Sequence, residues 1–92
     1  MTDLEIVKRC AEKMGYQVRE ASGLLWIGVD EYNPLTNSAQ TFELVEQFGL
    51  WIEQEKGKPC AVYIETAVTV YDPDLHRAIC LCVAGMPCPL PF

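Results

Sequence analysis

The chain has 92 residues, half of them hydrophobic, and 13 acidic against 7 basic side chains give it a formal net charge of −6. The hydrophobic content excludes a disordered chain, and the length fits one small domain that buries roughly 60–65% of its unfolded surface. The acidic balance argues against direct binding of nucleic acid, because affinity for phosphates depends on Lys and Arg.

The first predicted element is a helix that begins after Thr2. Thr2, with Glu5 three residues later, forms a capping box that satisfies free backbone N–H groups of the first turn. Gly15 is expected to end this helix. The apolar side chains between them fall at helical spacing and predict a buried stripe: Leu4, Ile6, Val7, Cys10, Ala11 and Met14.

Two short strands are expected next. Residues 16–19 alternate in polarity like a strand, residues 21–23 are typical of a turn, and residues 24–29 form a short apolar run. Trp26 lies in this run, and we expect it to be, with Trp51, one of the largest side chains of the core.

A second helix is predicted after the pair Asn33-Pro34. Pro34 fixes its own φ and biases Asn33 towards an extended conformation, so the pair is expected to end the preceding strand segment. Asn37 can cap the first turn with its side-chain oxygen, and Gln40 stands where a capping box has Glu or Gln. The helix is therefore expected to follow Asn37.

This second helix has one apolar face and one polar face. The apolar face carries Phe42, Leu44, Val45 and Phe48, and the polar face carries Gln40, Glu43, Glu46 and Gln47. Gly49 can adopt the left-handed conformation that ends a helix, and Leu50 is expected to fold back on Val45 in a Schellman-type contact.

Strands are expected again in the second half of the chain. Residues 50–53 and 60–64 predict two strands around the polar turn 55–58, and residues 67–71 predict a third, antiparallel strand.

A third helix is the last predicted secondary-structure element. Asp72 is expected to cap it, with Pro73 at the first helical position and Asp74 near the positive end of the helix dipole. Gly85 is expected to end it. The apolar stripe of this helix consists of Leu75, Ala78, Ile79, Cys82 and Val83.

This order predicts an α/β (α+β) fold in which a small, mainly antiparallel sheet of about four strands packs with three helices. Residues 1–86 are expected to form one domain, an α/β/α-type sandwich. Residues 87–92 carry proline at every second position and are expected to form an extended C-terminal arm.

The sequence also predicts the location of the protein. Its longest apolar runs are far below the ~20 residues that span a bilayer, and its start is acidic where a signal peptide is basic. We therefore expect a cytoplasmic protein that does not act at a membrane.

No basic residue stands between Arg19 and Lys56, although seven acidic residues do: Glu20, Asp30, Glu31, Glu43, Glu46, Glu53 and Glu55. This sector is either ordinary solvated surface or a face that binds a partner. The candidate partner-binding face consists of Glu43, Glu46, Gln47, Glu53 and Glu55.

The segment Tyr32, Asn33 and Pro34 is a second candidate site. It can be a surface recognition loop, or it can serve only to start the helix that follows.

Five cysteines raise the alternatives of a metal or redox site: Cys10, Cys60, Cys80, Cys82 and Cys88. An odd number of cysteines in a cytoplasmic protein is poor evidence for disulfides. Cys80 and Cys82 point about 200° apart around a helix, so they cannot chelate one ion together. His76 and Cys80 share a face but form only half of a zinc site, and we expect no metal and no cofactor.

Catalytic groups are few. His76 is the only histidine, and neither Ser22 nor Ser38 lies in the sequence context of a nucleophile elbow. We therefore expect no enzyme and assign no catalytic residue.

Several segments together resemble a known family. Residues 33–40, 44–50 and 74–84, together with the start of the chain, resemble the small phage and prophage proteins grouped as the phage ABA sandwich domain. The Asn-Pro-x-x-Asn-x-Ala-Gln pattern of residues 33–40 is also similar to that of NinX-type phage proteins. The resemblance implies an α/β sandwich encoded by a phage or prophage, and it brings no established activity.

The leading hypothesis is a non-enzymatic phage accessory protein that binds a host or phage protein in the bacterial cytoplasm. A second hypothesis is an acidic DNA mimic that inhibits a nucleic-acid enzyme. A third is a thiol or metal-binding protein that uses Cys80, Cys88 and His76. Self-association, for example through residues 87–92, also stays open.

Overall fold

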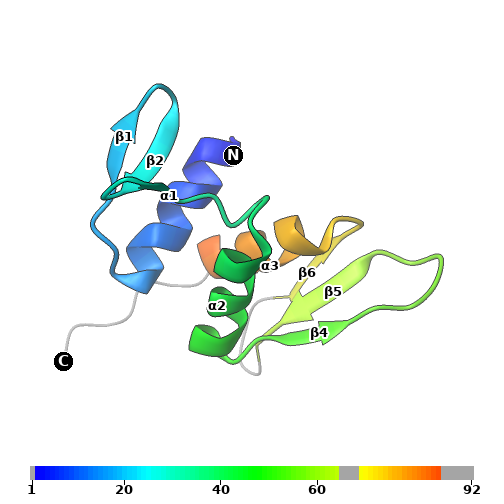
Figure 1. The fold of residues 1–92 in the computed structure, drawn as a ribbon. Coiled ribbons are helices and arrows are strands. Elements are labelled where there is room, and N and C mark those ends of the chain that lie inside the picture. Colours follow the sequence, from blue (N-terminus) through cyan, green and yellow to red (C-terminus); the bar gives the residue numbers. More distant parts are fainter. Residues whose placement is uncertain (1, 65–68, 86–92) are drawn as a thin grey trace.

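Helix α3 (Leu75–Ala84) lies at the centre of the fold, as the computed structural model shows for residues 2–64 and 69–85 (Figure 1). Its neighbours are helices α1 (Asp3–Met14) and α2 (Ser38–Phe48) and strands β5 (Cys60–Tyr63) and β6 (Thr69–Asp72). The predicted arm at residues 87–92 lies outside the described residues.

The strands form two antiparallel sheets of three strands each. Sheet A contains β1 (Arg19–Ala21), β2 (Leu24–Ile27) and β3 (Asp30–Glu31), and sheet B contains β4 (Trp51–Glu53), β5 and β6. The predicted α+β class is confirmed. We expected one sheet of about four strands, and the strands divide because β1, β2 and β3 are joined by tight turns and pair with one another before α2 begins.

The first of these sheets differs in detail from the prediction. The run 24–29 breaks at Gly28, whose φ of 64° turns the chain, and it leaves Val29 exposed before the unpredicted strand β3. The main packing partner of sheet A is α1, which contacts β2.

Helices α1 and α2 begin and end as predicted. The Thr2 hydroxyl accepts a hydrogen bond from the Glu5 N–H at 3.2 Å, and Asn37 Oδ1 accepts one from the Gln40 N–H at 3.1 Å. Gly15 and Gly49 both adopt the left-handed conformation. The predicted return of the chain at the end of α2 is also confirmed, since the Leu50 N–H donates to the Val45 carbonyl at 3.1 Å.

Gln40 does not reach back to its own cap. Its Oε1 accepts from the Asn33 N–H at 2.6 Å, and its Nε2 donates to the Glu31 carbonyl at 2.9 Å. The side chain therefore fastens the segment that leaves β3 to the first turn of α2, a contact that a local capping rule does not include.

The cap of α3 differs from the prediction. Asp74, not Asp72, is the N-cap, since its Oδ1 accepts from the N–H groups of His76 at 3.0 Å and Arg77 at 3.4 Å. Asp72 Oδ1 instead accepts from the Asp74 N–H at 2.9 Å in an Asx-type turn. Pro73 consequently precedes the cap, where it does not occupy the first helical position.

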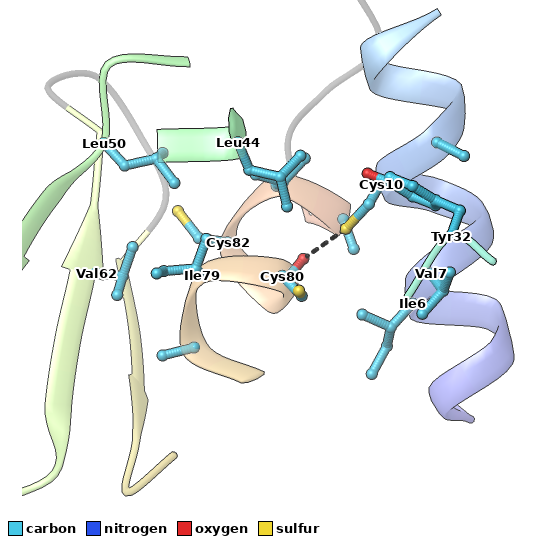
Figure 2. Close-up of a cluster of buried hydrophobic side chains, with 14 of the residues drawn as sticks. Ile6, Val7, Cys10, Tyr32, Leu44, Leu50, Val62, Ile79, Cys80 and Cys82 are labelled. Atoms are coloured by element: carbon cyan, nitrogen blue, oxygen red, sulfur yellow. Dashed lines mark hydrogen bonds between the residues drawn. The ribbon is translucent and has the colours of Figure 1, made fainter. Parts of the chain in front are cut away.

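Helix α3 is also more buried than its predicted stripe. Six of its side chains are buried, and they occupy more than one face: Ala78, Ile79, Cys80, Cys82, Val83 and Ala84. The reason is tertiary, because α1 and α2 cover one side of the helix and sheet B covers another (Figure 2). Cys80, which stands outside the predicted stripe, is fully buried.

The largest side chain in the core is Tyr32, and the predicted role of the tryptophans is wrong for Trp51. Trp51 is 58% exposed, while Trp26 is partly buried and donates from Nε1 to the Ala21 carbonyl at 3.2 Å. Tyr32 is only 2% exposed and lies among the buried side chains of the core (Figure 2). Its ring meets that of Tyr16 edge-on, with ring centroids 5.5 Å apart.

The apolar face of α2 also needs one correction. Phe42 was expected in the core but is 47% exposed, and Thr41 is buried next to Leu44 on the inner face. The Thr41 hydroxyl lies within hydrogen-bond reach of the carbonyl oxygens of Pro34 and Asn37, so its one hydrogen has an acceptor in the interior.

Among residues 2–64 and 69–85, no helix has both the length and the apolar character needed to cross a membrane.

The buried Tyr32 hydroxyl generates the first prediction. It has no hydrogen-bond partner among the described residues, and burial raises the pKa of Tyr32 far above its usual value. Tyr32→Phe removes an unsatisfied buried group, so the free energy of unfolding at neutral pH should stay equal or rise by about 1 kcal/mol. Urea denaturation monitored by circular dichroism measures this change.

The same substitution should change the response to alkaline pH. The unfolded chain ionises Tyr32 near pH ~10 while the folded chain keeps it neutral, so native stability falls as pH rises above ~10. The free energy of unfolding of Tyr32→Phe should therefore decrease less at alkaline pH than that of the native protein. Tyr71→Phe, at an exposed position, is the matched control. A loss of more than about 1 kcal/mol in Tyr32→Phe at neutral pH would show that the hydroxyl is hydrogen-bonded.

The position of the α3 cap gives a second prediction. Asp74→Ala should lower the free energy of unfolding by about 1 kcal/mol, because two backbone N–H groups lose their acceptor. Asp74→Asn keeps an acceptor oxygen and should retain most of that stability. Equal losses in the two variants would mean that the carboxylate acts through its charge and not as a cap.

Candidate functional site

Sheet B separates apolar from exposed side chains by the alternation of its strands. Ile52 lies opposite Val62, which lies opposite Val70, and this row packs against the core beside α3. The neighbouring positions point to the other side of the sheet. The β4–β5 hairpin projects away from the helices, so this second side is not covered by another described element (Figure 1).

Three aromatic side chains stand on that outer side, which we call the aromatic face: Trp51, Tyr63 and Tyr71. Trp51 is 58% exposed and Tyr71 is 68% exposed. Trp51 and Tyr63 are cross-strand partners whose rings stack with a centroid distance of 6.4 Å and an interplanar angle of 9°. Exposed clusters of large aromatic side chains mark binding surfaces more often than ordinary solvated surface.

A carboxylate is held against this face. The Tyr63 hydroxyl donates to Glu53 Oε1 at 2.9 Å, and this hydrogen bond raises the pKa of Tyr63. The bond uses one of the two carboxylate oxygens, and it positions the negative charge beside the stacked rings.

A hollow of about 260 Å³ opens on the same side of the sheet. Its lining comes from all three strands and the β4–β5 turn, and consists of Glu53, Glu55, Lys58, Pro59, Ala61 and Tyr71. Glu55 and Lys58 form an ion pair at 2.9 Å, but both side chains are about two-thirds exposed, so the pair is weak and easily exchanged. Two carboxylates against one ammonium leave the hollow negative.

The structure divides the predicted partner-binding face. It brings Glu53 and Glu55 together around the hollow, whereas Glu43, Glu46 and Gln47 lie exposed on α2 and do not line it. Glu43 instead accepts a hydrogen bond from the Tyr16 hydroxyl at 2.9 Å, next to the end of α1.

The aromatic residues of the face were not predicted as site residues. The sequence feature that could have identified them is the alternation of side chains along a strand. Trp51 and Glu53 occupy alternate positions of one strand, as do Thr69 and Tyr71. A polar residue at the alternate position indicates that the aromatic side chain shares its exposed side.

The predicted recognition loop is an internal segment. Tyr32 and Pro34 are buried, so their side chains are not available to a partner at the surface. Asn33 is partly buried, and its Oδ1 accepts from the Leu35 N–H at 3.2 Å in the turn that leads to α2. Of the two roles considered for this segment, the geometry supports helix initiation.

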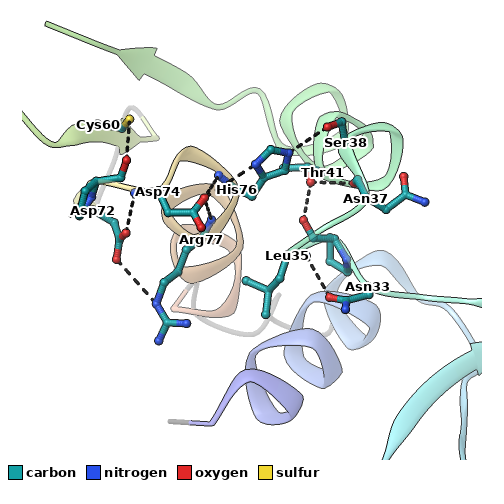
Figure 3. Close-up of polar contacts among 12 residues, drawn as sticks. Asn33, Leu35, Asn37, Ser38, Thr41, Cys60, Asp72, Asp74, His76 and Arg77 are labelled. Atoms are coloured by element: carbon teal, nitrogen blue, oxygen red, sulfur yellow. Dashed lines mark hydrogen bonds and ion pairs between the residues drawn. The ribbon is translucent and has the colours of Figure 1, made fainter. Parts of the chain in front are cut away.

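The structure brings a serine, a histidine and an aspartate together at the starts of α2 and α3 (Figure 3). Ser38 Oγ lies 3.0 Å from His76 Nε2, and Asp74 Oδ1 lies 3.8 Å from His76 Nδ1. The second distance exceeds that of a hydrogen bond, and the Asp74 oxygen is already the cap of α3. The three side chains therefore act mainly as a link between two helix starts.

The cysteines within the described residues are internal. Cys10, Cys60, Cys80 and Cys82 are all buried, and Cys10 Sγ donates to the Cys80 carbonyl at 3.4 Å (Figure 2). The contact with Cys10 and burial both raise the pKa of the Cys80 thiol, so it stays protonated and unreactive.

No group of three or more His, Cys, Asp or Glu side chains within residues 2–64 and 69–85 is placed to hold a metal ion. Cys88, a residue of the thiol or metal hypothesis, lies outside that range.

A second, apolar hollow of about 160 Å³ lies between α1, β2 and the segment before α2. Its walls include Leu4, Val7, Leu25 and Leu35, and Asp3 and Glu31 stand among its polar lining residues. Ligand pockets usually enclose about 300–1,000 Å³, so this hollow is too small for most metabolites.

Comparisons of the chain with protein-family models, curated proteins and solved structures find no match. The resemblance of residues 33–40, 44–50 and 74–84 to the phage ABA sandwich domain stays a prediction.

The tyrosine–carboxylate pair on sheet B gives the third prediction. Glu53→Gln should lower the pKa of Tyr63 towards its usual value, since the neutral amide stabilises the protonated phenol less than the carboxylate does. An NMR titration of the tyrosine ring resonances measures it.

The second such pair provides the control. The hydrogen bond to Glu43 raises the pKa of Tyr16, so Glu43→Gln should lower the pKa of Tyr16 and leave the pKa of Tyr63 unchanged. If Glu53→Gln left Tyr63 unchanged, the hydroxyl would not be bonded to Glu53 in solution.

Proposed function

We propose that this chain is a small protein-binding module that holds a host or phage protein on the aromatic face of sheet B. The observation that carries the proposal is the exposure of Trp51 and Tyr71 beside the stacked Tyr63, on a side of the sheet that no described element covers. Aromatic side chains are enriched among the residues that dominate protein–protein binding energy.

Burial of this face supplies a driving force for association. Each Å² of apolar surface removed from water contributes about 25 cal/mol, and Trp51 and Tyr71 are the largest exposed contributors on the face. The Trp51–Tyr63 stack also limits the freedom of both rings before binding, which lowers the entropy cost of association.

The origin and location proposed with this function follow from the resemblance in the sequence. We place the protein among phage- or prophage-encoded accessory proteins that act in the cytoplasm of the bacterial host. No catalytic step and no cofactor form part of the proposal.

The DNA-mimic hypothesis has less support from the geometry. A mimic needs a continuous array of carboxylates spaced like phosphates, whereas Glu43 and Glu46 stand on α2 and Glu53 and Glu55 line the hollow of sheet B. The aromatic face also has no counterpart in a phosphate backbone.

The fourth prediction tests the binding face. The tagged native protein and the double variant Trp51→Ser/Tyr71→Ser are compared in capture experiments from bacterial lysate, with Phe42→Ser on α2 as an exposed-aromatic control. A partner that is captured is then purified, and its dissociation constant is measured by calorimetry.

The double variant should bind that partner at least about 100-fold more weakly, a loss near 3 kcal/mol, because two central aromatic anchors are removed. Phe42→Ser should bind like the native protein. Retention of full affinity by the double variant, with an unchanged circular dichroism spectrum, would refute the proposed face.

A further inference from the structure

The row Glu53, Ala61 and Tyr71 gives the aromatic face a specific shape. These residues are paired in register across β4, β5 and β6, so Glu53 and Tyr71 stand on the two sides of Ala61. Strands two apart are separated by about 9–10 Å, and the methyl group of Ala61 fills little of that space. The result is a trough with a carboxylate wall, an aromatic wall and a small floor, which is the hollow of about 260 Å³.

The size of the trough limits its occupant. Its volume is just below the usual range of about 300–1,000 Å³ for pockets that enclose a whole ligand. It therefore suits one long side chain of a partner that lies on the rest of the face.

Charge selects the kind of side chain. Glu53 keeps one carboxylate oxygen free of the bond to Tyr63, and Glu55 can exchange its exposed partner Lys58 for a better-placed cation. The exposed ring of Tyr71 lines the same space, and an aromatic ring attracts a cation through its π-electrons.

A second copy of the chain is a poor occupant. A symmetric dimer through this face would bring two negatively charged troughs, each lined by Glu53 and Glu55, into one interface. The like charges would oppose association.

Single-stranded nucleic acid is a poor occupant too. Proteins that stack bases on aromatic side chains surround those side chains with positive charge, whereas the described lining of this trough has the carboxylates of Glu53 and Glu55 against the ammonium of Lys58.

The following inference rests on the proposed function. We propose that the partner presents a basic segment and that one of its arginine side chains enters the trough, between Tyr71 and the carboxylates of Glu53 and Glu55. Arginine fits better than lysine because its planar guanidinium stacks on an aromatic ring while its N–H groups donate to carboxylates beside the ring. The aliphatic part of the side chain lies over Ala61.

The first test uses short peptides and needs no knowledge of the partner. The isotope-labelled full chain is titrated with acetyl-Thr-Thr-Arg-Thr-Thr-amide, followed by NMR, beside matched peptides with lysine, citrulline or glutamate in the central position. The arginine peptide should shift the signals of Glu53, Ala61 and Tyr71. The citrulline peptide, which has the same shape without charge, should bind at least about tenfold more weakly, and the glutamate peptide should not bind.

Substitutions in the trough provide the second test. Ala61→Leu fills the floor without changing charge, and Glu53→Gln/Glu55→Gln removes charge with little change in shape. Each should weaken the arginine peptide by about tenfold or more. Glu20→Gln on β1 and Val29→Thr in the β2–β3 turn are matched controls outside the trough, and they should not change binding.

The outcomes separate this inference from the binding function itself. Equal binding of the arginine and citrulline peptides, or an unchanged affinity in Ala61→Leu, would refute the arginine site. If a captured protein still depended on Trp51 and Tyr71 but not on Ala61, the proposed function would stand and this inference would fail. Binding of an oligothymidine probe, or self-association, through the same residues would also overturn it.

Discussion

The burial of α3 is the constraint on which the rest of the structure depends. This ten-residue helix is apolar on more than one face, so one covering layer cannot remove its side chains from water. Helices α1 and α2 cover part of it, and the inner side of sheet B covers another part. Because the inner side of sheet B is used in this way, hydrophobic burial leaves its outer side available. The aromatic face is therefore a surface that the core does not need.

Polar contacts at helix starts fix the directions in which the covering elements run. Arg77 of α3 donates to Asp3 of α1 at 2.7 Å. His76 of α3 contacts Ser38 of α2 (Figure 3). Gln40 holds the chain that arrives from sheet A. These contacts lie near the solvent, where each contributes little to stability, but they select one arrangement among several that would bury the same apolar area.

The sequence predicts the parts of this fold that depend on neighbours in the chain. Thr2, Asn37 and the glycines that follow α1 and α2 act through local backbone geometry, which a single sequence contains. Which side chains of β4 face the core is harder to predict, because Trp51 and Ile52 are both apolar and either can face inward. The polar Glu53 at the alternate position is a weak local sign that Trp51 faces outward, and the pairing of Ile52 with Val62 against α3 fixes that side. The candidate site was missed for that reason, although the carboxylates of Glu53 and Glu55 stood in the predicted face. The burial of Thr41 likewise depends on the carbonyl of Pro34, which the sequence alone does not place there.

The two sheets are attached to different parts of the helical layer. Sheet A packs mainly on α1, whereas sheet B packs on α3. Amide exchange in small proteins often proceeds through partial openings of such separately attached units. Opening of strands β1, β2 and β3 would expose Leu25 to water but would leave the pairing of β4, β5 and β6, which carries Trp51, in place. Substitutions that loosen this N-terminal β-meander would then accumulate without loss of binding, and the two sheets are free to diverge at different evolutionary rates.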